Sequence, residues 1–125
     1  MPHHVSKERF AELVEQALAE LPEPFSDALE EVTIELRTRP TRSQLKGLGL
    51  RAEDLLLGLY SGVPLTRRHI EASQMPDKIH LFQEDIELVS DTEEELVEQV
   101  RVTVLHELGH HFGMDEDELE ALGYR

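Results

Sequence analysis

Apolar residues recur every three or four positions in the first part of the chain. The repeating positions are Phe10, Leu13, Val14, Ala17, Leu18 and Leu21. This spacing places their side chains on one face of an α-helix, so residues 6–21 are predicted to form an amphipathic helix. Ser6 is a suitable N-cap, and Pro22 and Pro24 close the helix. A short helical turn is predicted for residues 25–30.

Alternation of apolar and polar residues predicts strands in the middle of the chain. In one segment Val32, Ile34 and Leu36 alternate with Thr33 and Glu35, which is typical of a half-buried strand. The stretch rich in Arg, Pro, Ser and Gly at residues 38–52 is predicted to be a loop. The predicted strands cover residues 31–37, 55–61, 79–82 and 86–89, with the last two paired as a hairpin.

A second, longer amphipathic helix is predicted to begin near Ser90. Ser90 and Glu93 match the S-x-x-E capping box that often opens a helix. Its core-facing residues are Leu96, Val97, Val100, Val104 and Leu108, with Leu105 and Phe112 beside them. Together the patterns predict an α+β fold, in which a small mixed sheet of three to four strands packs against the N-terminal helix and the long helix. A length of 125 residues favours a single domain, residues 1–125.

The end of the long helix carries an H-E-x-x-H pattern, formed by His106, Glu107 and His110. Because residues four apart lie on the same face of a helix, the two imidazoles can bind one metal ion. The carboxylate of Glu107 is then close enough to take a proton from water on that metal. This geometry is typical of a zinc hydrolase, with Glu107 as general base.

A catalytic zinc needs a third protein ligand, and the residues after Gly113 offer several. Gly113 can end the helix with a positive φ angle, so that the chain turns sharply. The carboxylates of Asp115, Glu116, Asp117 and Glu118 follow directly. Counting from His106, the pattern is H-E-x-x-H-x-x-G-x-x-E, and it resembles extended zinc-peptidase motifs in which the third ligand stands at the position of Glu116. Glu116 is therefore the preferred third ligand, with Asp115 and Asp117 as alternatives.

The other histidines are expected to lie outside the metal site. His3 and His4 are predicted to belong to a disordered end, and His69 to a polar surface connection. His111 is turned about 100° from His110 around the helix, so it is expected to pack or to bond to a carboxylate.

The composition limits where and how the protein acts. There is no cysteine, which excludes disulfides and thiolate metal sites and favours a reducing, cytoplasmic location. No apolar run approaches the roughly 18 residues of a membrane span, so no membrane association is expected. The net charge is −15, but residues 37–68 contain seven of the 12 basic residues and only two acidic ones.

This basic segment, residues 37–68, carries a net charge of +5 against −20 for the rest of the chain. Repulsion of phosphates by the acidic remainder argues against nucleic acid as a partner. The segment is interpreted as a solvated surface that relieves the acidic remainder, and the alternative is that it selects acidic substrates or partners.

The sequence HELGHHFGMDEDELEALGY resembles the small bacterial zincin-like metallopeptidases, also called minimal zincins. The resemblance extends to DLLLGLYSGVPLTRRH and KIHLFQEDIEL and covers about residues 30–125. It implies a compact zincin-like domain with His106 and His110 as ligands, Glu107 as general base and an acidic residue after Gly113 as third ligand. The methionine-containing turn of larger relatives has no counterpart here.

These observations predict a Zn²⁺-dependent peptidase that acts on a peptide or protein substrate. Two alternatives remain open. The chain could be a metal-binding interaction module without proteolytic activity, since so small a domain has few elements with which to wall a deep cleft. It could also be a metal-dependent amidohydrolase with a non-peptide substrate.

Overall fold

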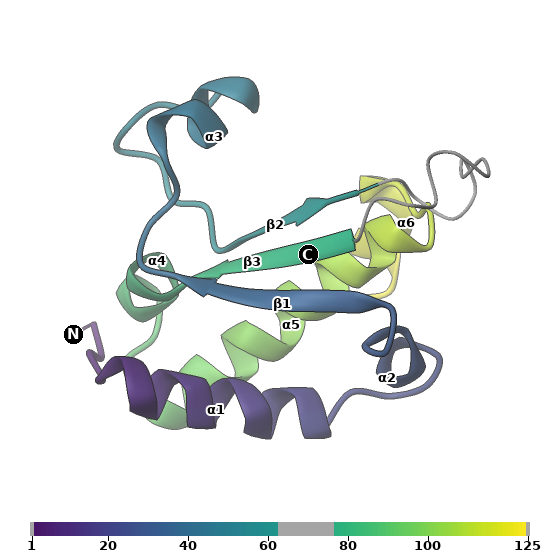
Figure 1. Ribbon diagram of the computed structural model, residues 1–125, viewed down its shortest axis with the longest axis horizontal. Helices are drawn as coiled ribbons and strands as arrows, with labels where there is room; N and C mark the ends of the chain where they lie inside the picture. The colour runs from purple at the N-terminus through teal and green to yellow at the C-terminus, as the bar shows by residue number, and fades with distance from the viewer. Residues whose placement is uncertain (1, 63–76, 125) are drawn as a thin grey trace.

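The computed structural model describes residues 2–62 and 77–124 of the chain. Figure 1 shows how the helices and strands in these ranges are arranged. The helices are α1 (Lys7–Ala19), α2 (Phe25–Ala28), α3 (Arg42–Gly47), α4 (Gln83–Leu88), α5 (Glu93–His111) and α6 (Glu116–Ala121), and the strands are β1 (Val32–Arg37), β2 (Gly58–Ser61) and β3 (Asp77–Phe82). The mixed sheet and its helices confirm the predicted α+β class.

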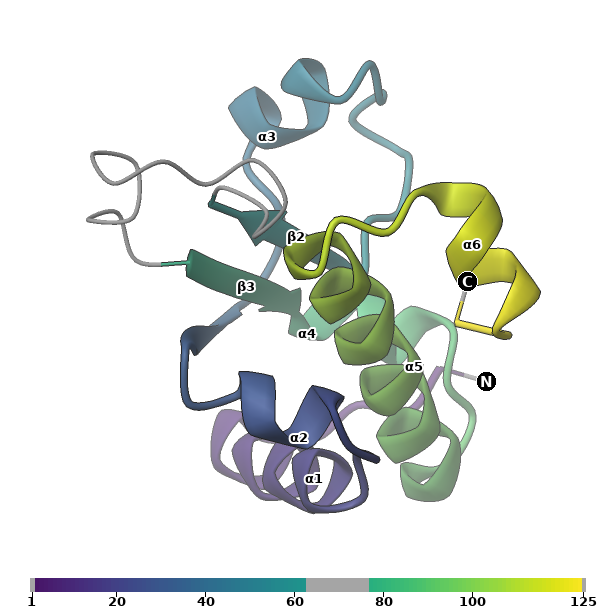
Figure 2. The same ribbon diagram turned by 90° about the vertical axis from the view of Figure 1, so that its right-hand side faces the viewer.

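The strands of this sheet lie in the order β1, β3, β2. Strand β1 runs parallel to β3, with Ile34 opposite Ile79, whereas β2 runs antiparallel to β3, with Tyr60 opposite Ile79. Strand β2 therefore forms one edge of the sheet, and it packs against α5, which lies beside it in Figure 2. Strand β2 begins at Gly58 rather than at residue 55, so the predicted strand was three residues too long.

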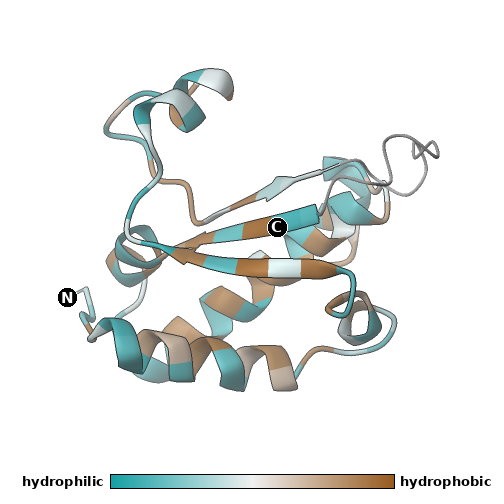
Figure 3. Cartoon of the chain, in the orientation of Figure 1, coloured by the Kyte–Doolittle hydropathy of each residue, from teal (hydrophilic) through white to brown (hydrophobic). Residues whose placement is uncertain are grey.

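The hydrophobic core lies between the sheet and the two longest helices. Helix α5 packs on β2 and β3 and also on α1, and the apolar residues predicted for both helices are among those that line this core. The alternation along β1 and β3 between hydrophobic and hydrophilic residues is visible in Figure 3. Ile79 and Leu81 are fully buried in this core. Their neighbour His80 lies on the other face, where it bonds to Glu35.

Two segments form helices where the sequence predicted a loop and a strand. The predicted loop contains α3, which begins with a reciprocal capping box between Thr41 and Gln44. In Figures 1 and 2 this helix stands away from α1 and α5. The predicted fourth strand is instead the end of α4, so the predicted hairpin is wrong. Ile86 is fully buried in α4. A buried apolar residue fits a strand as well as a helix, so its apolar character did not distinguish the two.

The start of α5 also differs from the prediction. Thr92, not Ser90, is the N-cap, and its hydroxyl accepts a hydrogen bond from the Glu95 amide. Ser90 is fully buried and donates its hydroxyl to the Ile86 carbonyl at the end of α4. The capping box predicted for Ser90 and Glu93 is therefore wrong, although the long helix itself is confirmed.

The N-terminal residues are tied to α4, which contradicts their predicted disorder. His3 donates its backbone N–H to the Ser90 carbonyl at 2.8 Å, and His4 Nδ1 lies 3.1 Å from Glu87 Oε1. Glu87 is buried and also accepts hydrogen bonds from the Val5 amide and from the side chain of Gln83.

Replacing Glu87 with Gln should destabilise the fold in a pH-dependent way. Burial alone would raise the pKa of Glu87, but hydrogen bonds from Val5, Gln83 and His4 outweigh it and hold that pKa below its ordinary value of 4.5. A lowered pKa gives stability that is present at neutral pH and lost as the pH falls through the folded-state pKa. Urea unfolding should show a loss of about 1–3 kcal/mol at pH 7 that shrinks towards pH 3. Glu84→Gln, on the exposed side of α4, is the control and should change stability by less than about 0.5 kcal/mol.

Helix α6 packs closely on α5 at Gly109. A Cβ atom there would overlap Cδ2 of Leu119, which is fully buried. The turn between the helices is a Schellman motif, in which Gly113 has φ +82° and Met114 donates its amide to the Gly109 carbonyl. The helix end predicted at Gly113 is thus confirmed, and Gly109 allows α6 to return along α5.

A methyl group at Gly109 should therefore disturb this packing. We expect Gly109→Ala to lower the free energy of unfolding by about 1–3 kcal/mol, because Leu119 has to move within a filled core. Gly47→Ala in α3 is the matched control, since a Cβ atom there meets nothing within 4 Å. That variant should be neutral or more stable by up to about 1 kcal/mol. Equal stability of the two variants in urea would contradict the packing argument.

Candidate metal centre

The imidazoles of His106 and His110 converge at the end of α5. Their Nε2 atoms lie 3.3 Å apart, and the ring planes are nearly perpendicular, at 81°. His106, Glu107 and His110 together bring their ligand atoms within 4.8 Å of one another. The four-residue spacing along the helix thus produces the convergence that the H-E-x-x-H pattern predicted.

A backbone carbonyl near the C-terminus determines which ring nitrogen of neutral His106 carries the proton. His106 Nδ1 lies 2.9 Å from the carbonyl oxygen of Tyr124. A carbonyl can only accept, so Nδ1 carries the proton, and in the neutral ring Nε2 keeps its lone pair. The Tyr124 ring packs edge-on against Phe25, at 5.5 Å between centroids. Tyr124 thus serves to pack this end of the molecule and to orient His106.

Glu116 completes a triangle with the two histidines. Its Oε1 lies 3.3 Å from His106 Nε2 and 3.1 Å from His110 Nε2. The carboxylate comes from the first turn of α6, at the position preferred from the sequence.

The neighbouring acidic residues are engaged elsewhere or are exposed. Asp115 is the N-cap of α6, where its side chain accepts the Glu118 amide and the Glu118 side chain accepts the Asp115 amide. Asp117 is exposed. The capping box uses Asp115 and Glu118 to start the helix and leaves Glu116 as the residue of this acidic run that meets the histidines.

The spacing of these three atoms fits a tetrahedral metal ion. Ligands about 2.0–2.1 Å from a tetrahedral ion lie roughly 3.3–3.4 Å from one another. The three edges between His106, His110 and Glu116 measure 3.3, 3.3 and 3.1 Å. Two neutral imidazoles and one carboxylate are also a common donor set for catalytic zinc, with the fourth position left open.

Glu107 lies beside the metal-facing atoms and is held by the edge strand. Its Oε1 accepts the backbone N–H of Tyr60 at 2.9 Å, and its Oε2 lies 3.8 Å from His106 Nε2. Burial raises the pKa of Glu107, although His106, His110 and the Tyr60 amide act in the opposite direction. A buried carboxylate with a raised pKa is suited to accept a proton.

Gly58 makes this contact between β2 and α5 possible. A Cβ atom at Gly58 would lie 2.5 Å from Thr103 Cγ2 and 3.6 Å from Glu107 Cγ. A glycine inside a strand can mark either the close approach of another backbone or tight packing. Packing against α5 accounts for Gly58, and this packing brings the Tyr60 amide to Glu107.

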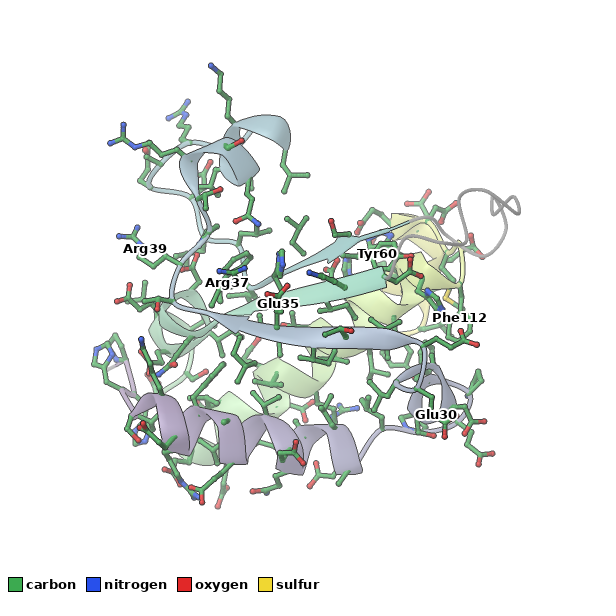
Figure 4. The ribbon with its side chains drawn as sticks, in the orientation of Figure 1. Glu30, Glu35, Arg37, Arg39, Tyr60 and Phe112 are labelled. Carbon is green, nitrogen blue, oxygen red and sulfur yellow. The ribbon has the colours of Figure 1, made fainter. Side chains whose placement is uncertain are left out.

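A second buried network adjoins the candidate site. His111 is fully buried, with Nδ1 2.7 Å from Asp77 Oδ2 and Nε2 3.2 Å from Glu31 Oε2. The Tyr60 hydroxyl donates to the same Asp77 oxygen at 3.0 Å. His111 thus bonds to carboxylates, as predicted. Figure 4 shows Tyr60 on β2 and Phe112, which follows His111, at the same end of the molecule.

A cleft of about 590 Å³ is lined by His106, His110 and Glu116. One side is formed by β2 and the residues before it, including Leu56, Leu59 and Tyr60. Leu48, half exposed after α3, and Met114 also line this cleft. The volume lies in the range of about 300–1,000 Å³ that is typical of ligand pockets.

The basic segment, residues 37–68, lies partly outside the described residues. Arg67, Arg68 and His69 belong to the range 63–76, which the structure does not describe. Within the described part, Arg37 pairs with Glu35 at 3.1 Å, and both are labelled in Figure 4. Further exposed pairs join Arg39 with Glu84 and Arg51 with Glu53, each at 3.7 Å. These contacts favour the solvated-surface interpretation for those three arginines.

The backbone contacts of this site could not be found from the sequence. The Tyr124 carbonyl and the Tyr60 amide act through the main chain, so the identity of their side chains carries no signal. Gly58 and Gly109 were the available hints, because a glycine inside a strand or helix indicates close packing.

No helix within residues 2–62 and 77–124 has the length and apolar character needed to span a membrane.

Comparison with known proteins shows what the chain is similar to in fold and in sequence. A solved structure, a conserved hypothetical protein (TTHA0227) from Thermo thermophilus, is similar to this chain at 25% identity with a TM-score of 0.54. The similarity covers 94% of this chain and 97% of that one. A search of curated proteins found no match. The family model for zincin-like metallopeptidases matches residues 29–124, and this range includes the two histidines, Glu107 and Glu116. The chain therefore belongs to the zincin-like metallopeptidase family.

Proposed function

We propose that this protein is a zinc-dependent peptidase. The observation that carries the proposal is the triangle of His106 Nε2, His110 Nε2 and Glu116 Oε1, whose edges of 3.1–3.3 Å match the ligand spacing around one tetrahedral ion. Membership of the zincin-like family, which implies a metal, supports it. His106, His110 and Glu116 would hold the ion, and all three line the larger cleft.

The protein residues around the ion divide the remaining work. When bound, zinc would act as a Lewis acid, which polarises the scissile carbonyl and lowers the pKa of water to about 7. Glu107 accepts the proton from the attacking water and transfers it to the leaving amine. Tyr124 keeps His106 in the tautomer that presents Nε2 to the cleft.

Strand β2 offers a place for an extended substrate. Leu57 accepts the Phe82 amide and Leu59 lies opposite His80, so alternate residues of this segment bond inward to β3. The peptide groups of Gly58 and Tyr60 therefore point to the outer edge. A peptide added along this edge would pass beside Glu107 and gain main-chain hydrogen bonds.

A second candidate function is a metal-binding module without proteolysis, acting through a protein partner. One observation favours it. The outward Tyr60 amide is already bonded to Glu107, so an extended peptide has to compete with that carboxylate for the donor.

Two measurements test the proposal and separate these candidates. Metal analysis of the purified protein should find one zinc per chain. Incubation with a broad peptide library should then give cleavage that stops with a chelator and returns when zinc is added. Zinc without cleavage of any peptide would favour the binding module, and absence of a bound metal would contradict both.

Replacing Glu107 with Gln should separate metal binding from turnover. Glutamine keeps the shape of the side chain but cannot accept the proton, so zinc content should be unchanged and peptide cleavage should fall by at least about 10³-fold. Glu94→Gln, in the exposed first turn of α5, is the control and should cleave like the wild type. Wild-type turnover by Glu107→Gln would remove this residue from the mechanism.

Replacing Glu116 with Gln should weaken zinc binding directly. Loss of the charged ligand should lower zinc affinity by at least about 100-fold, as measured by competition with a chromophoric chelator. Asp117→Asn is the matched control, because it removes one negative charge from the adjacent position. The assignment of the third ligand is wrong if these two variants bind zinc equally well.

A further inference from the structure

A second, smaller cavity borders the candidate metal centre. Its volume is about 230 Å³, and four residues line both it and the larger cleft: Leu56, Gly58, His106 and Glu107. The two cavities therefore meet at the edge of β2 beside Glu107. A peptide lying along β2 would pass from one cavity to the other at the point where the proton is taken.

The walls of the smaller cavity carry no charge apart from those two shared site residues. Leu55, Leu57 and Val102 supply apolar surface, and Gln99 and Thr103 are neutral. This lining stands out in a chain of which 31% is charged and whose net charge is −15. Leu55 is 46% exposed, so this apolar surface is open to solvent.

The leucine wall is held in place by hydrogen bonds outside the strand. The Leu56 amide donates to Oδ2 of buried Asp85 at 2.9 Å, and the Leu57 carbonyl accepts the Phe82 amide at 3.0 Å. The segment before β2 was predicted to be strand. Regular strand begins only at Gly58, and the three leucines before it line the cavity together with Gln99, Val102 and Thr103 of α5.

The size of the cavity indicates what it can hold. A pocket for a whole small ligand typically has about 300–1,000 Å³. The larger cleft lies within this range, and the smaller cavity lies below it. The smaller cavity is therefore sized for part of a ligand, such as one side chain.

We infer that this cavity is a specificity subsite, which binds the apolar side chain of the substrate residue next to the scissile bond. The inference rests on the proposed function, since it takes its position from the metal centre. The substrates are peptides with an aliphatic residue at that position, and Leu55, Leu57 and Val102 form the contact surface.

Binding of two amino-acid hydroxamates to the zinc-loaded protein tests this without requiring turnover. Glycine hydroxamate and leucine hydroxamate share the metal-binding group and differ in the side chain. Partial burial of the isobutyl group should make leucine hydroxamate bind about tenfold more tightly. Both dissociation constants can be measured by isothermal titration calorimetry.

Two variants test whether the preference for leucine hydroxamate comes from this cavity. Leu55→Asp places a charge in the cavity and should reduce the preference for leucine hydroxamate to less than about threefold. Leu88→Asp is the matched control, because Leu88 is similarly exposed at 50% but does not line the cavity. It should keep the wild-type preference.

The outcomes separate this inference from the proposed function. If neither hydroxamate binds the zinc-loaded protein, the proposed metal chemistry fails. If both bind with equal affinity, or if Leu55→Asp and Leu88→Asp behave alike, the metal site stands and the apolar subsite is refuted.

Discussion

Two close contacts with helix α5 are possible because one partner in each is a glycine, and the candidate site depends on both contacts. A Cβ atom at Gly58 would lie 2.5 Å from Thr103 Cγ2, and one at Gly109 would overlap Leu119 Cδ2. The first contact brings the Tyr60 amide to Glu107. The second brings α6 beside the histidines. The motif on α5 is thus completed by β2 and α6, which pack against this helix at two glycines.

Electrostatics give the cluster a reason to bind a cation. Glu107 and Glu116 both approach the two imidazoles, in a chain whose net charge is −15. Burial disfavours the ionised form of Glu107 and therefore raises its pKa. A divalent cation held by His106, His110 and Glu116 would offset the cost of keeping the nearby buried carboxylate of Glu107 ionised.

The sequence predicted those parts of the fold whose information is local and periodic. Helices α1 and α5 follow from apolar spacing, β1 follows from alternation, and Gly113 follows from the need for positive φ. Helix α3 was missed because two reciprocal hydrogen bonds between Thr41 and Gln44 outweigh an Arg-, Pro- and Gly-rich composition.

Other parts could not be predicted because tertiary contacts decide them. Residues 86–89 satisfy both a strand and a helix pattern, and packing on α5 selects the end of α4. The placement of Glu116 followed from its offset within the motif, which local geometry determines. By contrast, the carbonyl of Tyr124 reaches His106 only after α6 has folded back on Leu119, so no local pattern could reveal it.

The three candidate ligand residues differ in how firmly the fold holds them. His106 and His110 project from the 19-residue helix α5, whereas Glu116 lies on a six-residue helix and its side chain is 52% exposed. A helix this short is marginal alone, so α6 depends on its capping box and on Leu119. An ion that binds all three residues would favour the docked form of α6 by mass action. Docked α6 in turn presents the Tyr124 carbonyl that orients His106, so metal binding and packing of the C-terminal segment should reinforce each other.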